Sequence, residues 1–201
     1  MGEQQCVLIS KEGVEGVRAA MTDERQWIAL ARDGDTGAFG ELVKVYKDPI
    51  LRYLYKLTGD VEKASDLTQD TFLKAYQNLN SIRSDSAFKP WLYRIATRTV
   101  HSEWRRARLR VFIRFDGEKS PDGKLTEDTI KNFEEKIAVH NALQDVPQNQ
   151  RECLVLHFVE GFKYREIAVT LGISEEAVRK RVARGKEIFK DAYKFNGGEE
   201  K

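Results

Sequence analysis

The sequence predicts an all-α protein made of two small helical domains joined by a flexible acidic linker. Apolar residues recur at spacings of three and four along most of the chain, and no stretch of useful length shows the alternation typical of a strand. This periodicity fails between residues 116 and 128, an acidic stretch that contains two glycines and a proline. We therefore expect domains over residues 21–114 and 127–195, with a linker over 115–126.

The composition excludes several classes of protein. Hydrophobic residues make up 41% of the 201 residues, which is enough for a real core. No apolar run reaches the roughly 18 residues of a membrane-spanning helix, and the first twenty residues lack the features of a secretory signal. Two cysteines are too few for a disulfide framework or a four-cysteine zinc site, which favours a reduced cytoplasm.

The charged residues are unevenly distributed, although the formal net charge is only +2. Residues 91–114 contain seven arginines and one acid, and residues 163–190 contain eight basic residues and four acids. Basic blocks of this kind suit the neutralisation of nucleic-acid phosphates. A solvated helix face is the alternative explanation, and charge alone favours it.

The first predicted helices belong to the N-terminal domain. Thr22-Asp23-Glu24 has the pattern of an N-cap followed by acids, and Asp33-Gly34-Asp35 breaks the short helix that it opens. A longer helix follows, in which Pro49 predicts a kink or a restart. Thr58-Gly59-Asp60 ends this helix, and Asp60 can cap the next one. The long helix has one apolar stripe, formed by Phe39, Leu42, Val43, Tyr46, Ile50, Leu54 and Leu57.

Two more helices complete this domain, separated by a polar loop over residues 80–86. Two roles fit the aromatic residues of the second helix, which are interleaved with arginines: stacking on unpaired bases, or packing in the core. The first helix has one apolar face, formed by Ala64, Leu67, Thr71, Ala75 and Leu79. The second continues into the arginines after its apolar start, formed by Phe88, Trp91, Leu92, Ile95, Ala96 and Thr99.

The C-terminal domain contains the most specific local signal. Two helices are predicted first, over residues 126–147 and 151–160. A short helix over residues 164–171 then meets Gly172, which suits a left-handed helix-ending turn, and Ser174 is placed to cap a basic second helix. This is the pattern of a helix-turn-helix, whose second helix enters the major groove of DNA. An αα-hairpin with a solvated basic face is the alternative.

Three segments, in this order, resemble those of bacterial alternative sigma factors of the extracytoplasmic-function (ECF) group, over about Met21 to Tyr193. DLTQDTFLKAYQNL (66–79) is similar to the helix with which that family holds the clamp helices of the largest RNA polymerase subunit. SAFKPWLYRIATRTVHSEWRR (86–106) is similar to its promoter-melting and minus-ten helix. YREIAVTLGISEEAVRKRVARGK (164–186) is similar to its helix-turn-helix, which reads the minus-thirty-five element. The resemblance implies an alternative sigma factor that binds core RNA polymerase, directs it to specific promoters and assists promoter opening.

The resemblance also implies which residues act. The loop over residues 81–89 lies where the family captures a flipped base. Polymerase binding is implied for Asp66, Gln69, Asp70, Phe72 and Leu73. Minus-ten recognition and melting are implied for Ser81, Arg83, Ser84, Asp85, Lys89, Trp91, Arg94, Arg98, His101, Arg105 and Arg106. The helix-turn-helix contacts are implied for Tyr164, Arg165, Ser174, Glu176, Ala177, Arg179, Lys180, Arg181 and Arg184.

Three positions depart from the family's pattern. Arg98 stands where many members have asparagine, Ser102 where many have aspartate, and Ala177 where threonine is common. These differences leave the implied fold and function in place, and they leave the promoter sequence open.

The implied partners are core RNA polymerase and promoter DNA, and the family often has an anti-sigma factor that clamps both domains. We expect no cofactor, no metal, no membrane insertion and no catalytic site of the chain's own. Cys153 and His157 are four residues apart, but no further ligand is near them in sequence, so Cys153 is expected in the core. His101 and His140 are expected at the surface.

The ends of the chain carry no helical stripe. Residues 1–20 are expected to be a disordered extension or the result of a wrongly chosen start codon, and residues 196–201 a tail. A chain that begins at Met21 is therefore expected to fold and to transcribe normally.

Two other functions remain open on the sequence alone. A helix-turn-helix regulator that binds DNA by itself leaves the helix at 66–79 unexplained. An adaptor that sequesters a polymerase or sigma partner leaves both basic blocks unexplained.

Overall fold

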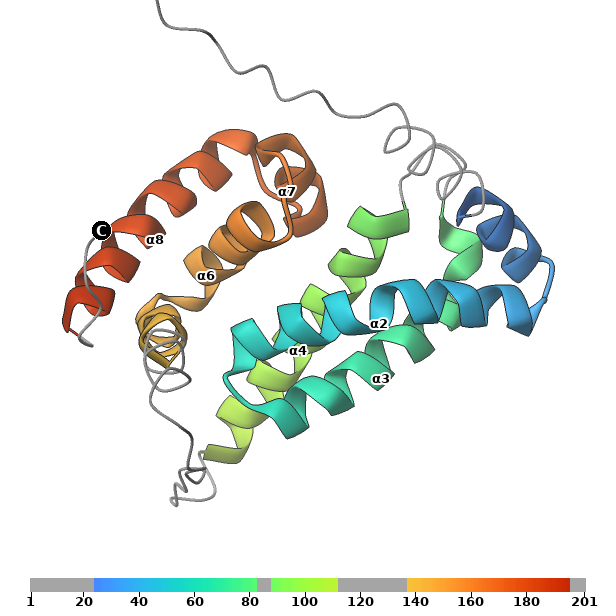
Figure 1. Ribbon diagram of the computed structural model, residues 1–201, viewed down its shortest axis with the longest axis horizontal. Coiled ribbons are helices and arrows are strands. Elements are labelled where there is room, and N and C mark those ends of the chain that lie inside the picture. Colours follow the sequence, from blue (N-terminus) through green and yellow to red (C-terminus); the bar gives the residue numbers. More distant parts are fainter. Residues whose placement is uncertain (1–23, 83–87, 112–136, 196–201) are drawn as a thin grey trace, which may run out of the picture.

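The computed structural model describes residues 24–82, 88–111 and 137–195, and every regular element in these ranges is helical. Figure 1 shows two groups of helices, one from each half of the chain. The prediction of an all-α protein with two helical domains is confirmed. Three predicted segments lie outside the described residues, namely the extension 1–20, the linker 115–126 and the tail 196–201.

α2 ends and α3 begins where the sequence predicts, whereas the cap predicted at Thr22-Asp23 lies outside the described residues. Asp35 caps α2, because its carboxylate accepts the N–H groups of Gly37 at 2.8 Å and Ala38 at 3.1 Å. Gly59 ends α2 with a φ of 75°, a conformation that glycine adopts without strain. Asp60 then caps α3 by accepting the Lys63 N–H at 3.0 Å. The elements of this group are a helix over 24–32, α2 (Thr36–Thr58), α3 (Val61–Gln77), the 3-10 turn η1 (Leu79–Ser81) and α4 (Phe88–Val111).

Pro49 does not interrupt the helix that contains it. α2 runs from Thr36 to Thr58, so the restart that Pro49 allows does not occur. A proline removes one backbone hydrogen bond and crowds the preceding turn. Tyr46, Ile50 and Tyr53 are nevertheless all buried around it. The packing of this stripe therefore outweighs the local cost of the proline.

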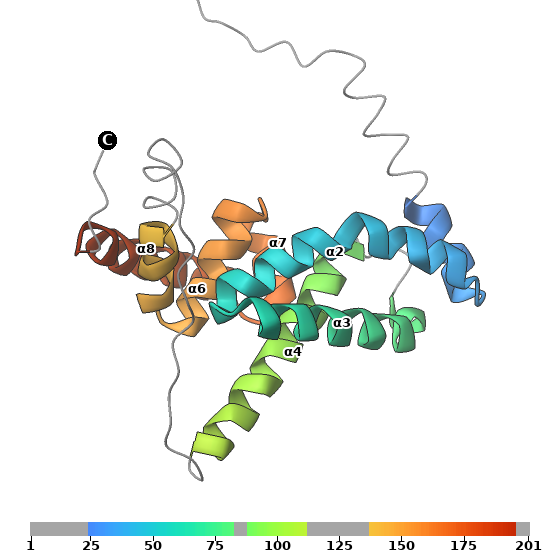
Figure 2. The same ribbon diagram turned by 60° about the horizontal axis from the view of Figure 1, so that its bottom comes forward.

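The predicted apolar faces meet in one core. α3 lies along α2, and α4 packs against both helices (Figures 1 and 2). The hydroxyls of Tyr53 and Thr97 lie 2.8 Å apart and join α2 to α4. The Tyr46 hydroxyl donates to the Glu24 carboxylate at 2.9 Å and joins α2 to the first helix. The three helices therefore form a platform that presents the outer faces of α3 and α4.

The C-terminal group is built around a buried helix. The helix predicted over 151–160 begins earlier, as α6, and its last turn is π-helical. Cys153, Leu154, Val155 and Leu156 are all buried, so the wider turn keeps this apolar run in the core. The elements are a helix over 137–145, α6 (Gln148–Leu154), the π-helical turn η2 (Val155–Val159), α7 (Tyr164–Leu171) and α8 (Glu175–Phe195).

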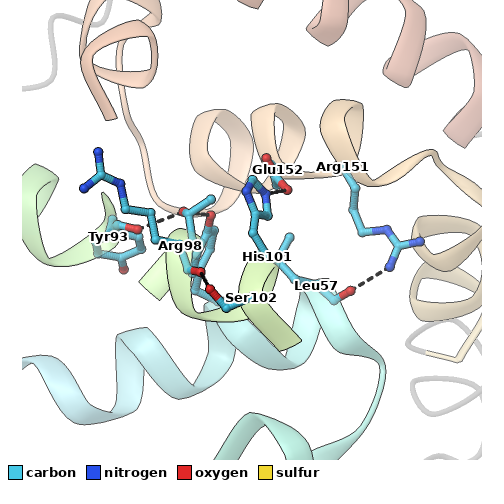
Figure 3. Close-up of polar contacts among 9 residues, drawn as sticks. Leu57, Tyr93, Arg98, His101, Ser102, Arg151 and Glu152 are labelled. Atoms are coloured by element: carbon cyan, nitrogen blue, oxygen red, sulfur yellow. Dashed lines mark hydrogen bonds and ion pairs between the residues drawn. The ribbon is translucent and has the colours of Figure 1, made fainter. Parts of the chain in front are cut away.

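The two domains pack against each other, which the sequence did not predict. Figure 3 shows His101 of α4 directed at α6, where its Nε2 bonds to the buried Glu152 carboxylate. Arg151 of α6 lies almost wholly inside the protein and donates to the Leu57 carbonyl at the end of α2, at 2.7 Å. Burial lowers the pKa of the Arg151 guanidinium. Its other donors are satisfied within the C-terminal domain by Gln144 and Val146.

A second set of contacts joins the start of α4 to the loop before α7. The buried Tyr93 hydroxyl donates to the Glu160 carboxylate, and the Lys89 ammonium donates to the Glu160 carbonyl at 2.9 Å. Burial, and then the neighbouring Glu160, raise the pKa of Tyr93. Lys89 also lies 4.9 Å from the centre of the Phe162 ring. Polar groups from both domains are thus paired at this junction.

Candidate functional site

The first candidate surface is the outer face of α3. Asp66, Gln69, Asp70 and Leu73 are exposed there and recur at helical spacing. Phe72, which belongs to the same predicted set, is 8% exposed and supports this face from the core. An exposed leucine one turn after an acid suits contact with a protein better than contact with nucleic acid, because carboxylates repel phosphates.

The Asp70 carboxylate is available to a partner. Lys74 is its neighbour one turn along α3, with Nζ 3.7 Å from Oδ2. An exposed pair at this distance contributes little to stability. The Gln69-Asp70 pair therefore stands on a solvated surface, as predicted.

The second candidate surface is the basic face of α4. Arg94, Arg98 and Arg105 share one face of the helix, and Arg106 lies exposed beside them. The helix thus carries a row of guanidiniums that can bind phosphates. Ser81 is exposed at the end of η1. The predicted residues Arg83, Ser84 and Asp85 lie outside the described residues.

Trp91 is a core residue with one polar edge. It is 9% exposed, and its ring centre lies 5.6 Å from that of Phe88. The indole N–H donates to the Ser81 hydroxyl at 3.3 Å. Of the two predicted roles for this side chain, the structure supports packing. The Ser81 contact also ties the start of α4 to the preceding turn.

The predicted surface positions of two histidines were wrong. His101 is half-buried against Glu152, and His140 is half-buried with its ring stacked 5.0 Å from that of Tyr55. Burial, followed by nearby cations, lowers the pKa of His140. Both partners come from the other domain, so no local pattern in the sequence signals these contacts.

The third candidate surface is the helix-turn-helix of α7 and α8. Gly172 adopts the predicted left-handed conformation, with a φ of 69°, and its N–H donates to the Ala168 carbonyl at 2.9 Å. The Ser174 hydroxyl caps α8 by accepting the Ala177 N–H at 3.1 Å. The two helices are held by buried side chains, which include Ile167, Val178 and Val182. The turn chemistry predicted from the sequence is confirmed.

The outer side of α8 carries exposed cations held by acids of the same helix. Lys180 Nζ lies 2.7 Å from Glu176 Oε1, and Arg179 Nη2 lies 3.8 Å from Glu175 Oε1. These pairs are exposed, so phosphates or base edges can replace the carboxylates at little cost. Arg184 is also exposed, about one turn further along the same helix.

Three further members of the predicted set are less accessible. Arg181 is half-buried and lies beside the Cys153 thiol of α6. Tyr164 is half-buried, with its ring 4.7 Å from that of His157. Ala177 is half-buried near the cap of α8, whereas Arg165 is exposed.

The exposed cations of α8 predict two different mutational signatures. Arg179 lies in the N-terminal half of α8, which is the part that reads base edges in a helix-turn-helix, together with Glu176 and Lys180. Arg179→Ala is expected to cost about 1–3 kcal/mol and to relax preference at one base pair. Arg184→Ala should instead weaken binding to every sequence and reduce the salt slope by about one.

The measurement is transcription from a promoter library at two salt concentrations, with core RNA polymerase supplied. Wild-type preference and affinity in both variants would mean that α8 does not read DNA.

The described residues offer little support for metal binding, for a cysteine nucleophile or for a membrane span. No group of three or more His, Cys, Asp or Glu side chains there is placed to hold a metal. Burial raises the pKa of the Cys153 thiol to about 11, which makes it a poor nucleophile at neutral pH. None of the helices in the described ranges is both long and apolar enough to cross a bilayer.

Sequence reasoning missed the residues that join the domains. Arg151, Glu152 and Glu160 belong to an apolar helix and its end, and their partners lie in the other half of the chain. Arg151 and Glu152 stand out only because they are buried, and burial cannot be read from the sequence.

Two family models match the chain. Sigma-70 region 2 matches residues 42–110 and Sigma-70 region 4 matches residues 136–188. Both matches fall inside the two domains expected from the periodicity. The first covers α3 and α4, and the second covers the helix-turn-helix.

Curated relatives and a solved structure agree with these matches. The RNA polymerase sigma-H factor of Pseudomonas aeruginosa is 31% identical over 84% of this chain and 93% of its own length. The ECF RNA polymerase sigma factor SigW of Bacillus subtilis is 29% identical over 81% of this chain and 92% of its own. The sigma factor RpoE of Bartonella quintana, solved with the anti-sigma factor NepR, matches with a TM-score of 0.64 at 24% identity, over 78% of this chain and 96% of that one.

Proposed function

Because the chain belongs to the ECF RNA polymerase sigma factors, we propose that each of its three candidate surfaces performs one step of transcription initiation. The α3 face binds core RNA polymerase. The basic face of α4 and the turn before it recognise the minus-ten element and assist its opening. The outer side of α8 recognises the minus-thirty-five element.

One observation carries this proposal: an acidic, solvated face and two basic helices occur on one chain within the two matched regions. A regulator that binds DNA alone has no use for the face formed by Asp66, Gln69, Asp70 and Leu73. An adaptor has no use for two rows of exposed arginines. A sigma factor uses both kinds of surface, since it must hold an enzyme and a promoter together.

The geometry of α4 suggests how this surface assists promoter opening. The Arg94, Arg98 and Arg105 row binds the backbone, and the Ser81 turn is tied to the helix by the Trp91 indole. A flipped base costs a few kcal/mol of unstacking. The phosphate contacts and the fixed position of the turn offset that cost by holding the strand in place.

We extend the proposal to partners, location and the absence of an active site. We propose that an anti-sigma factor binds this chain, as NepR binds the Bartonella quintana relative. The chain would work in the cytoplasm with the polymerase, and bond formation would belong to that enzyme. The high pKa of Cys153 supports the last point, since it removes a candidate nucleophile.

Co-elution and promoter binding together test the proposal. The purified chain is mixed with core RNA polymerase, and a promoter fragment is added before and after complex formation. We expect co-elution with the core enzyme and sequence-specific promoter binding only in the complex. Tight specific binding by the chain alone would favour the regulator, and co-elution without any DNA binding would favour the adaptor.

A further inference from the structure

The packing of the two domains forms a basic cavity of about 730 Å³ that is partly open to solvent. It lies between α4 on one side and α6, α7 and α8 on the other. Its size falls in the range of small-molecule sites, roughly 300–1,000 Å³. The cavity therefore has room for a ligand but not for a DNA duplex.

The charges that line the cavity are unbalanced. Arg94, Arg98 and Arg105 of α4 line it together with Arg181 of α8, and Glu152 is the single carboxylate in the lining. The Glu152 carboxylate is already bonded to His101. Four guanidiniums and one engaged carboxylate thus line the cavity. Repulsion between Arg181 of α8 and the arginines of α4 opposes the packing of the two domains.

None of these four guanidiniums is compensated elsewhere in the described residues. No ion pair with a carboxylate involves any of them. This distinguishes them from Arg179 and Lys180, which are paired with acids of their own helix.

Two buried polar atoms in the cavity wall also lack partners. The Nε of Arg94 is buried without a hydrogen-bond acceptor. The Thr170 hydroxyl is also buried without a partner, in a residue that is only 3% exposed. Most buried polar atoms in proteins are paired. Arg94 and Thr170 thus line the same cavity from the two domains, but these two atoms are themselves covered by protein, so the accessible guanidiniums carry the argument for a ligand.

We propose that this cavity binds a small oligophosphate, in which at least two linked phosphate groups bridge α4 to α7 and α8. The four guanidiniums and the Glu152 carboxylate of the lining sum to an excess of three positive charges, and a triphosphate carries roughly three to four negative charges near neutral pH. The row from Arg94 to Arg105 extends roughly 16 Å along α4. A single phosphate spans too little of this row to engage it, whereas a chain of phosphates reaches several guanidiniums.

The source of the phosphates is either an inorganic oligophosphate or a nucleotide. Trp104 also lines the cavity, next to His101, with the two ring centres 5.5 Å apart. These rings offer a stacking surface to a base. A nucleotide would therefore bind more tightly than the bare phosphate chain if it is the natural ligand.

Such a ligand would favour the packed arrangement of the two domains and compete with promoter DNA for the α4 arginines. This consequence rests on the proposed function, but the binding itself does not. Binding is therefore measured on the full chain without polymerase or DNA, so that a failure of this inference is distinguishable from a failure of the proposed function.

The test is calorimetric titration of the full chain at a fixed, near-physiological salt concentration. The probes are inorganic tripolyphosphate, inorganic phosphate and a nucleoside triphosphate. We expect one tripolyphosphate per chain, at least about tenfold tighter binding than for inorganic phosphate, and a higher unfolding temperature in its presence. A nucleoside triphosphate that binds more tightly than tripolyphosphate identifies a nucleotide as the source, and equal or weaker binding identifies the phosphate chain alone.

Matched variants separate this site from general charge attraction. Arg181→Gln and Arg105→Gln should each weaken tripolyphosphate binding at least about fivefold. Arg25→Gln removes an exposed guanidinium outside the cavity and should change it less than about twofold. If either first variant fails to fold, Arg98→Gln, at an exposed position of the lining, takes its place. Absence of saturable binding, or an equal loss in Arg25→Gln, would overturn the proposal.

Discussion

Replacing both Gln69 and Asp70 by alanine is expected to weaken binding to core RNA polymerase about thirtyfold or more. Both side chains are exposed on α3 and stand on the face that also presents Leu73. A few interface residues usually carry most of the binding energy, and a loss of about 2 kcal/mol corresponds to about thirtyfold. The affinity is measured by titrating labelled chain with core enzyme.

The fold should survive this change. Exposed substitutions away from caps and cores usually alter stability by less than about 0.5 kcal/mol. The matched control replaces Lys47 and Asp48, another exposed neighbouring pair, on α2. Loss of polymerase binding in the α3 variant but not in the α2 variant assigns the effect to this face. Equal affinities for the α3 variant and the wild type would count against the assignment.

Trp91→Ala is expected to lower the free energy of unfolding by about 3–5 kcal/mol, as truncation of a buried aromatic residue usually does. The indole is 9% exposed, packs on Phe88 and donates to Ser81. Urea unfolding followed by circular dichroism measures the loss. Trp91→Phe keeps part of the packing but removes the hydrogen bond and one fused ring, so it should cost less than Trp91→Ala, about 1–2 kcal/mol.

The same pair of variants tests the role of Trp91 in promoter opening. If the indole only fixes the turn at Ser81, Trp91→Phe should slow open-complex formation more than initial binding, because the turn is freed while the core is kept. The defect should shrink on a promoter with a pre-melted bubble, where the bases are already unstacked. Equal loss of both steps would make Trp91 a purely structural residue.

Local features were predictable because their causes are local. Asp35, Gly59 and Ser174 occupy cap and turn positions that only a few residue types fill well, and each does what its type predicts. The same holds for the apolar stripes, since helical periodicity fixes which residues face inward. The outer faces of α3 and α8 follow directly, as the opposite sides of those stripes.

The remaining features depend on contacts between distant parts of the chain. The spacing of Trp91 fits stacking on bases as well as packing, and only the position of Phe88 and Ser81 in space separates the two. Pro49 looks like a break until the buried neighbours that hold α2 together are known.

The junction between the domains shows the same limit. His101 was expected at the surface, whereas in the structure it bonds to Glu152 of the other domain. The basic cavity exists only because Arg181 of α8 is brought opposite the α4 arginines. No spacing within one helix contains that information.

Run-off transcription with purified core RNA polymerase and genomic promoter fragments tests the central claim most directly. We expect specific transcripts when the chain is added to core enzyme, none from core enzyme alone, and far fewer with the Gln69→Ala, Asp70→Ala double variant at the same concentration. Core enzyme that binds the chain but initiates at no promoter, on any fragment tested, would contradict the assignment of this chain as a sigma subunit.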